Sequence, residues 1–469
     1  MVETQHKSNV SEWLDLALFR LARHVMVRPL EKRFALGLLD KAPSLKKWVK
    51  ARVVGNNATP EDPPDVPCGR NLFVDASRLA GEDGNTGIPR VTRSVLFSLM
   101  EDPPEGLNVV PVFATKRQPG YFELKGHGLP FEQRNASSPG AGKDPSPISF
   151  GSGDIFLCLD YNPLLMNIQR YYLSAIQKEG VKIFTIVHDL IPIRMPEKCP
   201  PGQREMHEDW LRTILRFNGA ICVSRTVAED LRQWVLEEAP EKKAPFHIGW
   251  FHLGADFERF PPLNGSVSKE LSCKKELSVR PFILMVGTVE GRKGYSQALE
   301  AFEVLWGRGE DVSLVIVGKE GWLVQDLVKR IRSHPELGKR LLWFEDLGDE
   351  QLSELYCSCR ALLMASESEG FGLPLVEAAR AKAPLIARDL PIMREVTGGR
   401  AFFFKGETAV ELADSIEEWF DLFNKGVHPK PDGVPWRTWA QSSKQLSEAI
   451  LAMERQGCKD PVSGLEEPL

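Results

Sequence analysis

The sequence has no apolar run long enough to cross a lipid bilayer. A membrane-spanning helix needs about 20 consecutive apolar residues, and no stretch of the 469 residues approaches that length. The first twenty residues also lack the pattern of a secretory leader. Glu12 and Asp15 interrupt their apolar patch, and no small-residue cleavage site follows. We therefore expect a cytoplasmic protein without a membrane span.

Cysteine is scattered, and neither sign of charge dominates. Of the eight cysteines only Cys357 and Cys359 are close together, and a single C-x-C pair is a poor metal site. This usage is typical of free thiols in a reducing compartment. The formal net charge of −5 argues against a nucleic-acid-binding protein. The sequence has no D-x-D motif and no His/Asp cluster with metal-ligand spacing, so we expect no metal and no other cofactor.

Residues 11–54 differ from the rest because they are basic and amphipathic. Leu14, Leu18 and Leu21 fall at helical spacing and would share one apolar face. Basic residues far outnumber acidic ones between positions 20 and 52. Such a stretch suits an anionic membrane surface, which would make the protein peripheral to the cytoplasmic membrane. The alternative is a solvated helical arm that packs on the body of the protein.

The remaining sequence alternates between strand and helix patterns in two blocks. A chain of this length can form two or more domains, each with its own core. Apolar runs at 71–75, 154–159 and 182–187 predict buried strands in the first block, and runs at 281–288 and 312–317 predict them in the second. This alternation favours mainly parallel sheets with helices on both faces. We therefore predict an α/β fold with two Rossmann-like domains that face each other across a cleft.

Residues 366–377, with the sequence S-E-S-E-G-F-G-L-P-L-V-E, carry the strongest functional pattern. They follow an apolar run at 361–365 that predicts a buried strand, and they lead into a helix predicted at 375–381. In open α/β sheets, ligands bind at the carboxyl ends of the strands. Gly370 and Gly372 would let the backbone approach a ligand closely. The free N–H groups at the helix start suit a diphosphate.

Two glutamates, Glu369 and Glu377, flank this phosphate site. A carboxylate repels phosphate, so we expect both side chains to hold hydroxyl groups instead. The spacing E-x7-E, with E-G-F-G-L-P inside it, resembles the family 4 retaining glycosyltransferases, which have the GT-B fold, and among them bacterial O-antigen and capsule mannosyltransferases. The resemblance implies that Glu369 contacts the transferred sugar and that Glu377 binds the nucleotide's ribose. The alternative is a capped helix with surface glutamates.

Two adjacent cations, Arg292 and Lys293, follow the first strand of the second block. Such a pair at a strand end neutralises a diphosphate well. Family 4 enzymes hold the donor phosphates with an equivalent pair, and the alternative is two solvated surface cations. In relatives the nucleobase lies near the segment that ends at Leu347. The predicted donor-binding residues are Gly287, Thr288, Gly318, Leu347, Gly370, Phe371, Gly372, Leu373, Pro374 and Glu377.

The first block supplies the opposite side of the predicted cleft. Residues 83–90, D-G-N-T-G-I-P-R, form a glycine-bearing turn into a helix predicted at 91–100. They resemble the T-G-I-x-R-V segment of family 4. The resemblance implies that Gly87 approaches the ligand and that Arg90 faces the phosphates or the acceptor. An ordinary helix salt bridge is the alternative for Arg90.

A polar pair, His188 and Asp189, ends the strand predicted at 182–187. The end of an apolar strand is a suitable place for chemistry, and H-D-L-I-P resembles the bacterial members of the family. His188 is our candidate for positioning the sugar's O6 or the acceptor, with Asp189 beside it on the acceptor or phosphate side. The alternative is a histidine that its neighbours hold for structural reasons.

These motifs imply a retaining, metal-independent hexosyltransferase with Glu369, His188, Arg292 and Lys293 as its catalytic residues. The two cations and the helix start would take the charge of the leaving diphosphate. The favoured donor is GDP-mannose, while UDP-glucose, UDP-galactose and dTDP-rhamnose stay open. The acceptor is expected to be a lipid-linked or polysaccharide chain in cell-surface glycan synthesis. A sugar-nucleotide epimerase of the same fold and an inactive scaffold of a polysaccharide assembly complex are the alternatives.

The resemblance covers residues 71–455 and sets the expected domain boundaries. In GT-B proteins a final helix crosses back to the first domain, which suits an amphipathic segment at 436–453. The expected parts are a basic helical extension and linker at 1–69, an acceptor-side Rossmann-like domain at 70–262, a linker at 263–280, a donor-side Rossmann-like domain at 281–432, the returning helix at 433–456 and a disordered tail at 457–469.

Overall fold

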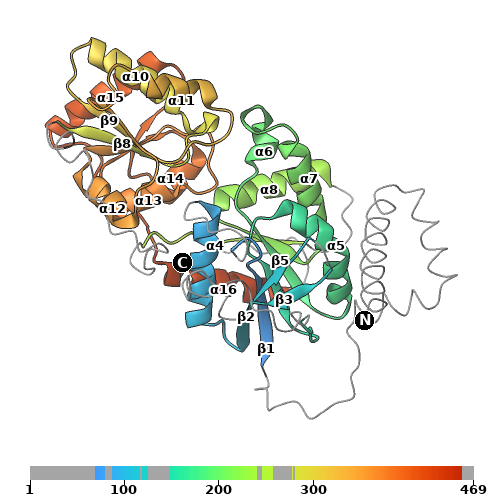
Figure 1. The fold of residues 1–469 in the computed structure, drawn as a ribbon. Helices are drawn as coiled ribbons and strands as arrows, with labels where there is room; N and C mark the ends of the chain where they lie inside the picture. The colour runs from blue at the N-terminus through green and yellow to red at the C-terminus, as the bar shows by residue number, and fades with distance from the viewer. Residues whose placement is uncertain are drawn as a thin grey trace, which may run out of the picture. The chain divides into compact units, whose positions relative to one another are not determined.

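The structure, a computed structural model, describes residues 69–79, 87–116, 119–124, 148–239, 246–256, 277 and 280–456. The predicted basic extension at 11–54 and the predicted tail lie outside these residues, as does most of the linker at 263–280. The described residues belong to one compact unit that contains two sheets (Figure 1). None of the described helices is both long and apolar enough to cross a membrane.

The first sheet has seven strands in the order β3-β2-β1-β4-β5-β6-β7. Its strands pair in parallel except β2 and β3, which are antiparallel. The strands are β1 (Arg70–Asp75), β2 (Leu107–Ala114), β3 (Tyr121–Glu123), β4 (Ile155–Cys158), β5 (Lys182–Val187), β6 (Gly219–Cys222) and β7 (His247–Trp250). The helices are α4 (Ile88–Glu101), α5 (Pro163–Lys178), α6 (Ile191–Arg194), α7 (Gln203–Ile214) and α8 (Arg225–Glu238), with the 3-10 turn η2 (Pro196–Lys198).

The second sheet has six strands in the order β10-β9-β8-β11-β12-β13, all parallel. The strands are β8 (Phe282–Val286), β9 (Ser313–Val317), β10 (Leu341–Phe344), β11 (Ala361–Met364), β12 (Leu385–Arg388) and β13 (Phe402–Phe404). The helices are α10 (Tyr295–Gly307), α11 (Gln325–Arg332), α12 (Asp349–Ser358), α13 (Leu373–Arg380), α14 (Pro391–Thr397), α15 (Ala409–Asn424) and α16 (Trp439–Gln456), with the 3-10 turn η3 (Gly291–Lys293).

Both sheets reverse their strand order at the centre. The first reverses between β1 and β4, and the second between β8 and β11. All residues of β4, β9 and β11 are buried, as expected for parallel strands with helices on both faces. The crevice outside such a reversal, at the carboxyl ends of the strands, is where ligands bind in α/β proteins. The α/β prediction is therefore confirmed, and the segment 366–377 follows β11 at this point.

Three helices begin at positions that differ from the sequence prediction. Helices α4 and α13 each begin earlier, at Ile88 and Leu373, because Pro89 and Pro374 fit the first turn of a helix. The last helix begins three residues later than predicted, at Trp439. The residues that we expected to form its first turn are not helical, because Arg437 pairs with Gly254 in an isolated parallel bridge.

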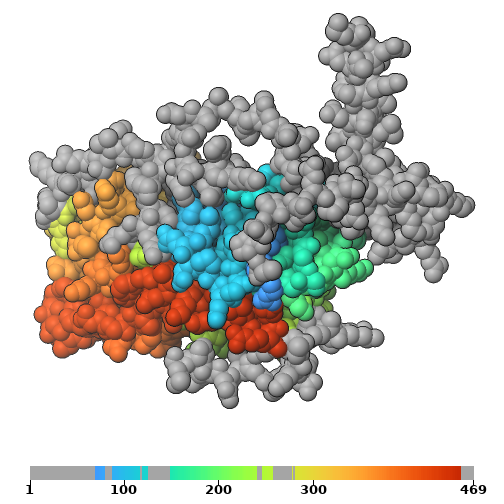
Figure 2. All heavy atoms as spheres, turned by 90° about the horizontal axis from the view of Figure 1, so that it is seen from below, coloured from blue at the N-terminus to red at the C-terminus, as the bar shows by residue number. Residues whose placement is uncertain are grey.

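The last helix, α16, packs against the first sheet although it follows the second in sequence. It contacts α4, β6 and β7, and Figure 2 shows the red helix alongside the blue α4. The side chain of Gln445 accepts a hydrogen bond from the His252 backbone N–H, and Ser442 Oγ donates to the His252 carbonyl. An ion pair between Arg70 and Glu454 ties the helix to the start of β1. The expected domain boundaries themselves stay a prediction.

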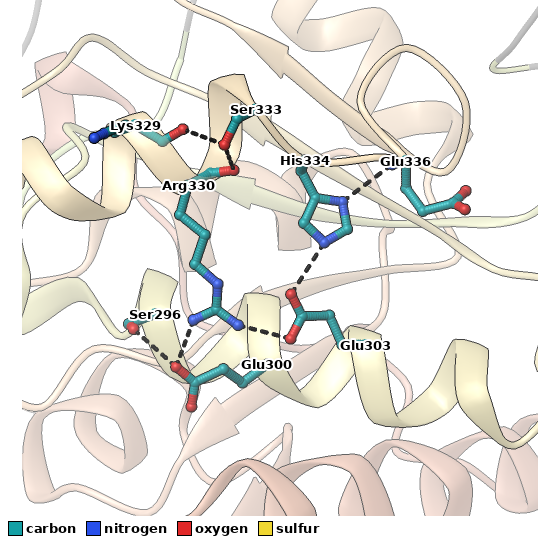
Figure 3. Close-up of polar contacts among 8 residues, drawn as sticks. All are labelled: Ser296, Glu300, Glu303, Lys329, Arg330, Ser333, His334 and Glu336. Carbon is teal, nitrogen blue, oxygen red and sulfur yellow. Dashed lines mark hydrogen bonds and ion pairs between the residues drawn. The ribbon is translucent and has the colours of Figure 1, made fainter.

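A surface network joins α10 to α11 in the second block (Figure 3). Arg330 pairs with Glu300 at 2.7 Å and with Glu303 at 2.6 Å, and His334 Nε2 lies 3.0 Å from Glu303. The side chains of Arg330 and Glu300 are 38% and 43% exposed, so solvent screens most of this attraction. The network fixes how α11 lies on α10 but contributes little stability.

A single carboxylate, Glu395 on α14, joins the second block to the first. It accepts hydrogen bonds from the backbone N–H groups of Arg225 and Thr226 at 2.7 and 2.8 Å, and it lies 2.7 Å from His252 Nε2. Arg225 and Thr226 form the first turn of α8, whose N–H groups have no partner within the helix. Glu395 therefore caps a helix of the other block.

We predict that Glu395→Gln lowers the free energy of unfolding by about 3 kcal/mol at pH 7. Burial opposes ionisation of Glu395, but hydrogen bonds from His252, Thr226 and Arg225 outweigh it and lower its pKa to about 2. Because the pKa of Glu395 is lower in the folded than in the unfolded protein, its ionisation stabilises the fold at pH values above the ordinary pKa of glutamate. This stabilisation is lost as the pH falls towards 2. Urea unfolding of both proteins should give a difference that shrinks below about pH 4.5. A difference that does not change with pH would contradict this role.

Candidate functional site

The candidate site is built on the carboxyl ends of β8 and β11. Glu369, in the turn after β11, has a side chain that is 8% exposed. Its Oε1 lies 2.5 Å from Lys293 Nζ, and its Oε2 lies 3.5 Å from Arg292 Nη1. Both cations belong to η3, which follows β8. The reversal of strand order thus places Glu369 beside Lys293, which precedes it by 76 positions, and beside the adjacent Arg292.

The charges in this cluster stabilise one another. Burial opposes ionisation of Glu369, but Lys293 and Arg292 outweigh it and hold the pKa of Glu369 below its ordinary value. Arg292 also pairs with Glu290 at 3.0 Å and donates to the Ser368 carbonyl at 3.1 Å. Burial raises the pKa of Glu290, and the two cations only partly offset this effect. The site therefore holds an ionised Glu369 beside two cations.

Gly370 places this cluster against the first sheet. A methyl group at Gly370 would lie 1.9 Å from the carbonyl oxygen of His188, which directly follows β5. The hydroxyl of Ser224, at the end of β6, donates to the Gly370 carbonyl at 2.8 Å. Only glycine permits this approach of the His188 backbone to residue 370. The sequence suggested glycine here for the approach of a ligand, and the contact with the protein's own backbone is a stricter reason for it. The turn after β11 thus contacts the carboxyl ends of β5 and β6.

His188 is a buried, neutral histidine at this contact. Its side chain makes no hydrogen bond through Nε2 to any described residue. Burial lowers the pKa of His188 to about 4, although Asp189 opposes the shift. Asp189 itself accepts a hydrogen bond from the Ile191 N–H at 3.0 Å. At neutral pH His188 can therefore position a hydroxyl group but does not carry a charge.

The second glutamate, Glu377, is 3% exposed and already has two partners. Arg90 Nη1 donates to its Oε1 at 2.9 Å, and the Tyr356 hydroxyl donates to its Oε2 at 2.8 Å. Arg90 thus forms a salt bridge with a residue of α13, and its expected contact with the phosphates or the acceptor stays a prediction. The expectation of surface glutamates is also wrong for Glu377. Ribose binding to Glu377 stays a prediction, and it would require Glu377 to share or release Arg90.

Two glycines bring the ends of β8 and β9 close together. A methyl group at Gly318 would lie 2.0 Å from the Gly287 carbonyl, and Gly287 has a φ of 137°. The hydroxyl of Tyr295 donates to the same carbonyl at 2.6 Å. Thr288 follows Gly287 at this strand end, whereas Leu347 lies beyond the end of β10. Contact of these residues with a donor stays a prediction.

The start of α13 supplies free backbone donors. Gly372, the residue before the helix, has a φ of 89° and offers no side chain that could cap it. Pro374 has no N–H group, and Leu375 donates to the Gly372 carbonyl. The Leu373 N–H remains available at the positive end of the helix dipole. Gly87 precedes α4 in the same way, with a φ of 62° and no atom within 4 Å of a methyl group placed there.

Comparison with known proteins agrees with this geometry. Residues 269–425 match the model of the glycosyl transferases group 1. The chain is 37% identical over 382 residues to the serotype-specific mannosyltransferase WbdA of Escherichia coli, a match that covers 80% of this chain and 46% of that protein. It is 24% identical over 373 residues to the O-antigen chain mannosyltransferase RfbU of Salmonella typhimurium, covering 77% of this chain and 92% of that protein.

A solved structure agrees at the level of the fold. Sucrose-phosphate synthase from Thermosynechococcus elongatus superposes with a TM-score of 0.51 at 15% identity, covering 83% of this chain and 96% of that one. This chain contains a group 1 glycosyl transferase domain in a GT-B fold. The chain spans slightly less than half the length of the WbdA proteins that it matches.

The structure adds two partners of site residues that the sequence did not indicate. Ser224 holds Gly370, and Tyr356 holds Glu377. Tyrosine and serine are too common for sequence alone to mark them. On the first sheet, Asp160 follows the strand pattern at 154–159, which places it at a strand end that would face the cleft. Asp160 is 5% exposed, and its Oδ1 has no partner among the described residues. Burial and the nearby Asp75 raise the pKa of Asp160 to about 7.

We predict that Gly370→Ala destabilises the glycosyl transferase fold by about 2 kcal/mol. The added methyl group cannot avoid the His188 carbonyl, because both clashing partners are backbone or directly attached to it. Gly307→Ala is the matched control, since its methyl group would meet no atom within 4 Å. Denaturant unfolding measures both. Equal stability of the two variants would show that the turn does not need this close contact.

We also predict that Arg90→Met lowers the free energy of unfolding by about 3 kcal/mol, because it leaves the buried Glu377 without its cation. The control is Arg212→Met. Arg212 is 45% exposed and pairs with Glu208 on its own helix, so its loss should cost less than about 1 kcal/mol. Chemical denaturation at pH 7 compares the two. A loss for Arg90→Met no larger than for the control would contradict the proposed importance of the pair.

Proposed function

We propose that this chain is a retaining glycosyltransferase that moves mannose from GDP-mannose to a lipid-linked or polysaccharide acceptor in cell-surface glycan synthesis. The observation that carries the proposal is the cluster of Glu369, Lys293 and Arg292 at the strand reversal of the second sheet. The mannosyltransferases to which the chain is similar support mannose as the sugar. We further propose that it acts on the cytoplasmic side of the membrane, with residues 11–54 as the membrane contact.

The departing nucleoside diphosphate needs positive charge close to it. Arg292 and Lys293 supply two cations whose side chains are each 14% exposed, so solvent weakens their attraction only slightly. The Leu373 N–H at the start of α13 adds a third donor. These groups are fixed by the fold before the donor arrives, which is the condition for effective electrostatic stabilisation of a leaving group. The mechanism therefore does not require a metal ion.

The transferred sugar would lie between the two blocks. Glu369 accepts hydrogen bonds from sugar hydroxyls and so orients the anomeric carbon. His188 contributes a neutral imidazole from the first sheet, and its unpartnered Nε2 can bond a further hydroxyl. The contact at Gly370 joins these two groups and excludes water from the reacting bond, which suppresses hydrolysis of the donor. Asp160 adds a carboxyl group on the acceptor side.

We predict that Glu369→Gln lowers turnover at least about a hundredfold while nucleotide affinity changes less than about fivefold, because the carboxylate contacts the sugar and not the nucleotide. Glu367→Gln is the matched control, since Glu367 lies in the same turn but is 35% exposed and pairs with Lys198. Steady-state kinetics and nucleotide titration separate the two effects. Equal losses in turnover and in binding would remove this role from Glu369.

We predict that the combined change Arg292→Ala and Lys293→Ala abolishes turnover, because no cation would face the leaving diphosphate. Chelation of divalent metals by EDTA should leave the wild type active. The control is Lys329→Ala with Arg330→Ala, an adjacent pair of cations on α11. Release of nucleoside diphosphate measures all three proteins. Strong inhibition by EDTA would contradict the metal-free mechanism.

The dependence on acceptor separates the proposed activity from its alternatives. A transferase releases GDP from GDP-mannose mainly when a lipid-linked mannan primer is present. An epimerase of the same fold would convert the nucleotide sugar without any acceptor, and an inactive scaffold would do neither. Release of nucleotide that is independent of acceptor, with a changed sugar as product, would favour the epimerase and overturn the proposal.

A further inference from the structure

A second cavity lies at the opposite edge of the second sheet from Glu369. It has a volume of about 550 Å³ and lies at the amino ends of β8, β11 and β12, since Pro281, Arg360 and Pro384 directly precede these strands and line it. The predicted donor site lies at the carboxyl ends of the same strands. We call this space the basic cavity, and the lining residues that matter here are Arg360, Lys382, Phe423, His428, Lys430 and Asp432.

Three cations line the basic cavity without an ion-pair partner among the described residues. Arg360, Lys382 and Lys430 form no such pair, although most arginines on this block do, for example Arg308 and Arg330. Asp432 is the one acidic lining residue. The chain as a whole is acidic, with a net charge of −5, so this positive charge does not follow from composition. Clustered cations that repel one another and lack counter-charges favour binding of an anion.

Neighbouring aromatic rings hold two of these cations in place. The Arg360 guanidinium lies over the Phe423 ring, 4.6 Å from its centroid, which leaves the edges of the guanidinium free for hydrogen bonds. The Phe423 and His428 rings stack at 4.6 Å. Lys430 Nζ lies 3.1 Å from His428 Nε2. Burial, with a contribution from Lys430, lowers the pKa of His428, so the imidazole stays neutral and accepts from the ammonium.

The third cation has a strained backbone. Lys382 has a φ of 63°, and Leu323 is the only other described non-glycine residue with a positive φ. Lys382 follows the end of α13, where glycine is the usual residue because it adopts this conformation without strain. Strain of this kind is found where a side chain has a role that glycine cannot fill. At this position the side chain adds a third positive charge to the cavity.

We propose that the basic cavity binds a phosphate group, either of a soluble phosphate ester or of a lipid head group. The phosphate would bind in this cavity beside three cations that have no ion-pair partner among the described residues, one of them the strained Lys382, whether or not the proposed transferase activity holds. Helix α13 links the two sites, because it begins at the turn that holds Glu369 and ends two residues before Lys382. Its eight residues span only about 12 Å. An anion in the basic cavity is therefore placed to influence the turn.

The test is a calorimetric titration of the full-length protein with sodium pyrophosphate. All proteins in this titration carry Arg292→Ala and Lys293→Ala as a background, so that pyrophosphate does not bind at the donor site. In that background we expect Arg360→Ala with Lys430→Ala to weaken binding at least about tenfold. Lys178→Ala with Arg216→Ala removes the same charge from the first block and should leave the affinity unchanged. Absence of binding in the background at about 10 mM, or equal binding by both pairs of variants, would overturn the proposal.

Vesicle sedimentation then distinguishes the two sources of phosphate. If a lipid head group is the ligand, phosphatidylglycerol vesicles should sediment the Lys178 and Arg216 control protein more than the Arg360 and Lys430 variant, and phosphatidylcholine vesicles should show no difference. If the ligand is soluble, the two proteins should sediment equally while their pyrophosphate affinities still differ. The comparison between variants cancels any contribution of residues 11–54.

Lys382→Gly gives an independent test, because unfolding of the variant could not produce its expected result. Glycine relieves the positive φ, so the melting temperature should rise. The same change removes a cation, so the affinity for pyrophosphate should fall at least about fivefold. Unchanged affinity in the stabilised variant would remove Lys382 from the site and contradict the functional explanation of its strain.

Discussion

The contact between Gly370 and the His188 carbonyl is the constraint on which the site depends. It fixes the turn after β11 against the ends of β5 and β6, and Ser224 secures the same turn from the first sheet. Glu369 precedes Gly370 directly, so the contact also sets how far the carboxylate lies from the first sheet. The two cations that neutralise Glu369 come from η3, which follows the neighbouring strand β8. A single backbone approach thus sets where this charged cluster lies relative to the first sheet.

Several contacts between the two blocks are polar pairs. Arg90 meets Glu377, Lys198 meets Glu367, and Glu395 caps α8. Polar groups in such contacts can exchange their partners for water or a ligand. This exchange costs less free energy than the opening of a packed hydrophobic interface. The donor that we propose, with its hydroxyls and diphosphate, would supply replacement partners for Glu377 and for the cations beside Glu369.

The sequence predicted the parts of the site that depend on local pattern. Strand ends, glycine turns and adjacent cations are local, so the sequence could name Glu369, Arg292, Lys293 and Gly370 as candidates. Partners that are distant in the sequence could not be named, because no local pattern specifies them. Arg90 and Glu377 are 287 residues apart, and only the packing of α4 near α13 makes them neighbours. The start of α16 was misplaced for a similar reason, since Arg437 pairs with Gly254.

A thermal-shift comparison of GDP, UDP, dTDP and ADP, with and without magnesium, tests the account most directly. A ligand that binds only the folded protein, at a hundred times its Kd, adds about 2.7 kcal/mol to the free energy of unfolding. GDP should raise the melting temperature most, magnesium should not change this shift, and GDP-mannose should behave in the same way. A shift that requires magnesium, or no shift with GDP, would contradict a metal-free donor site for GDP-mannose.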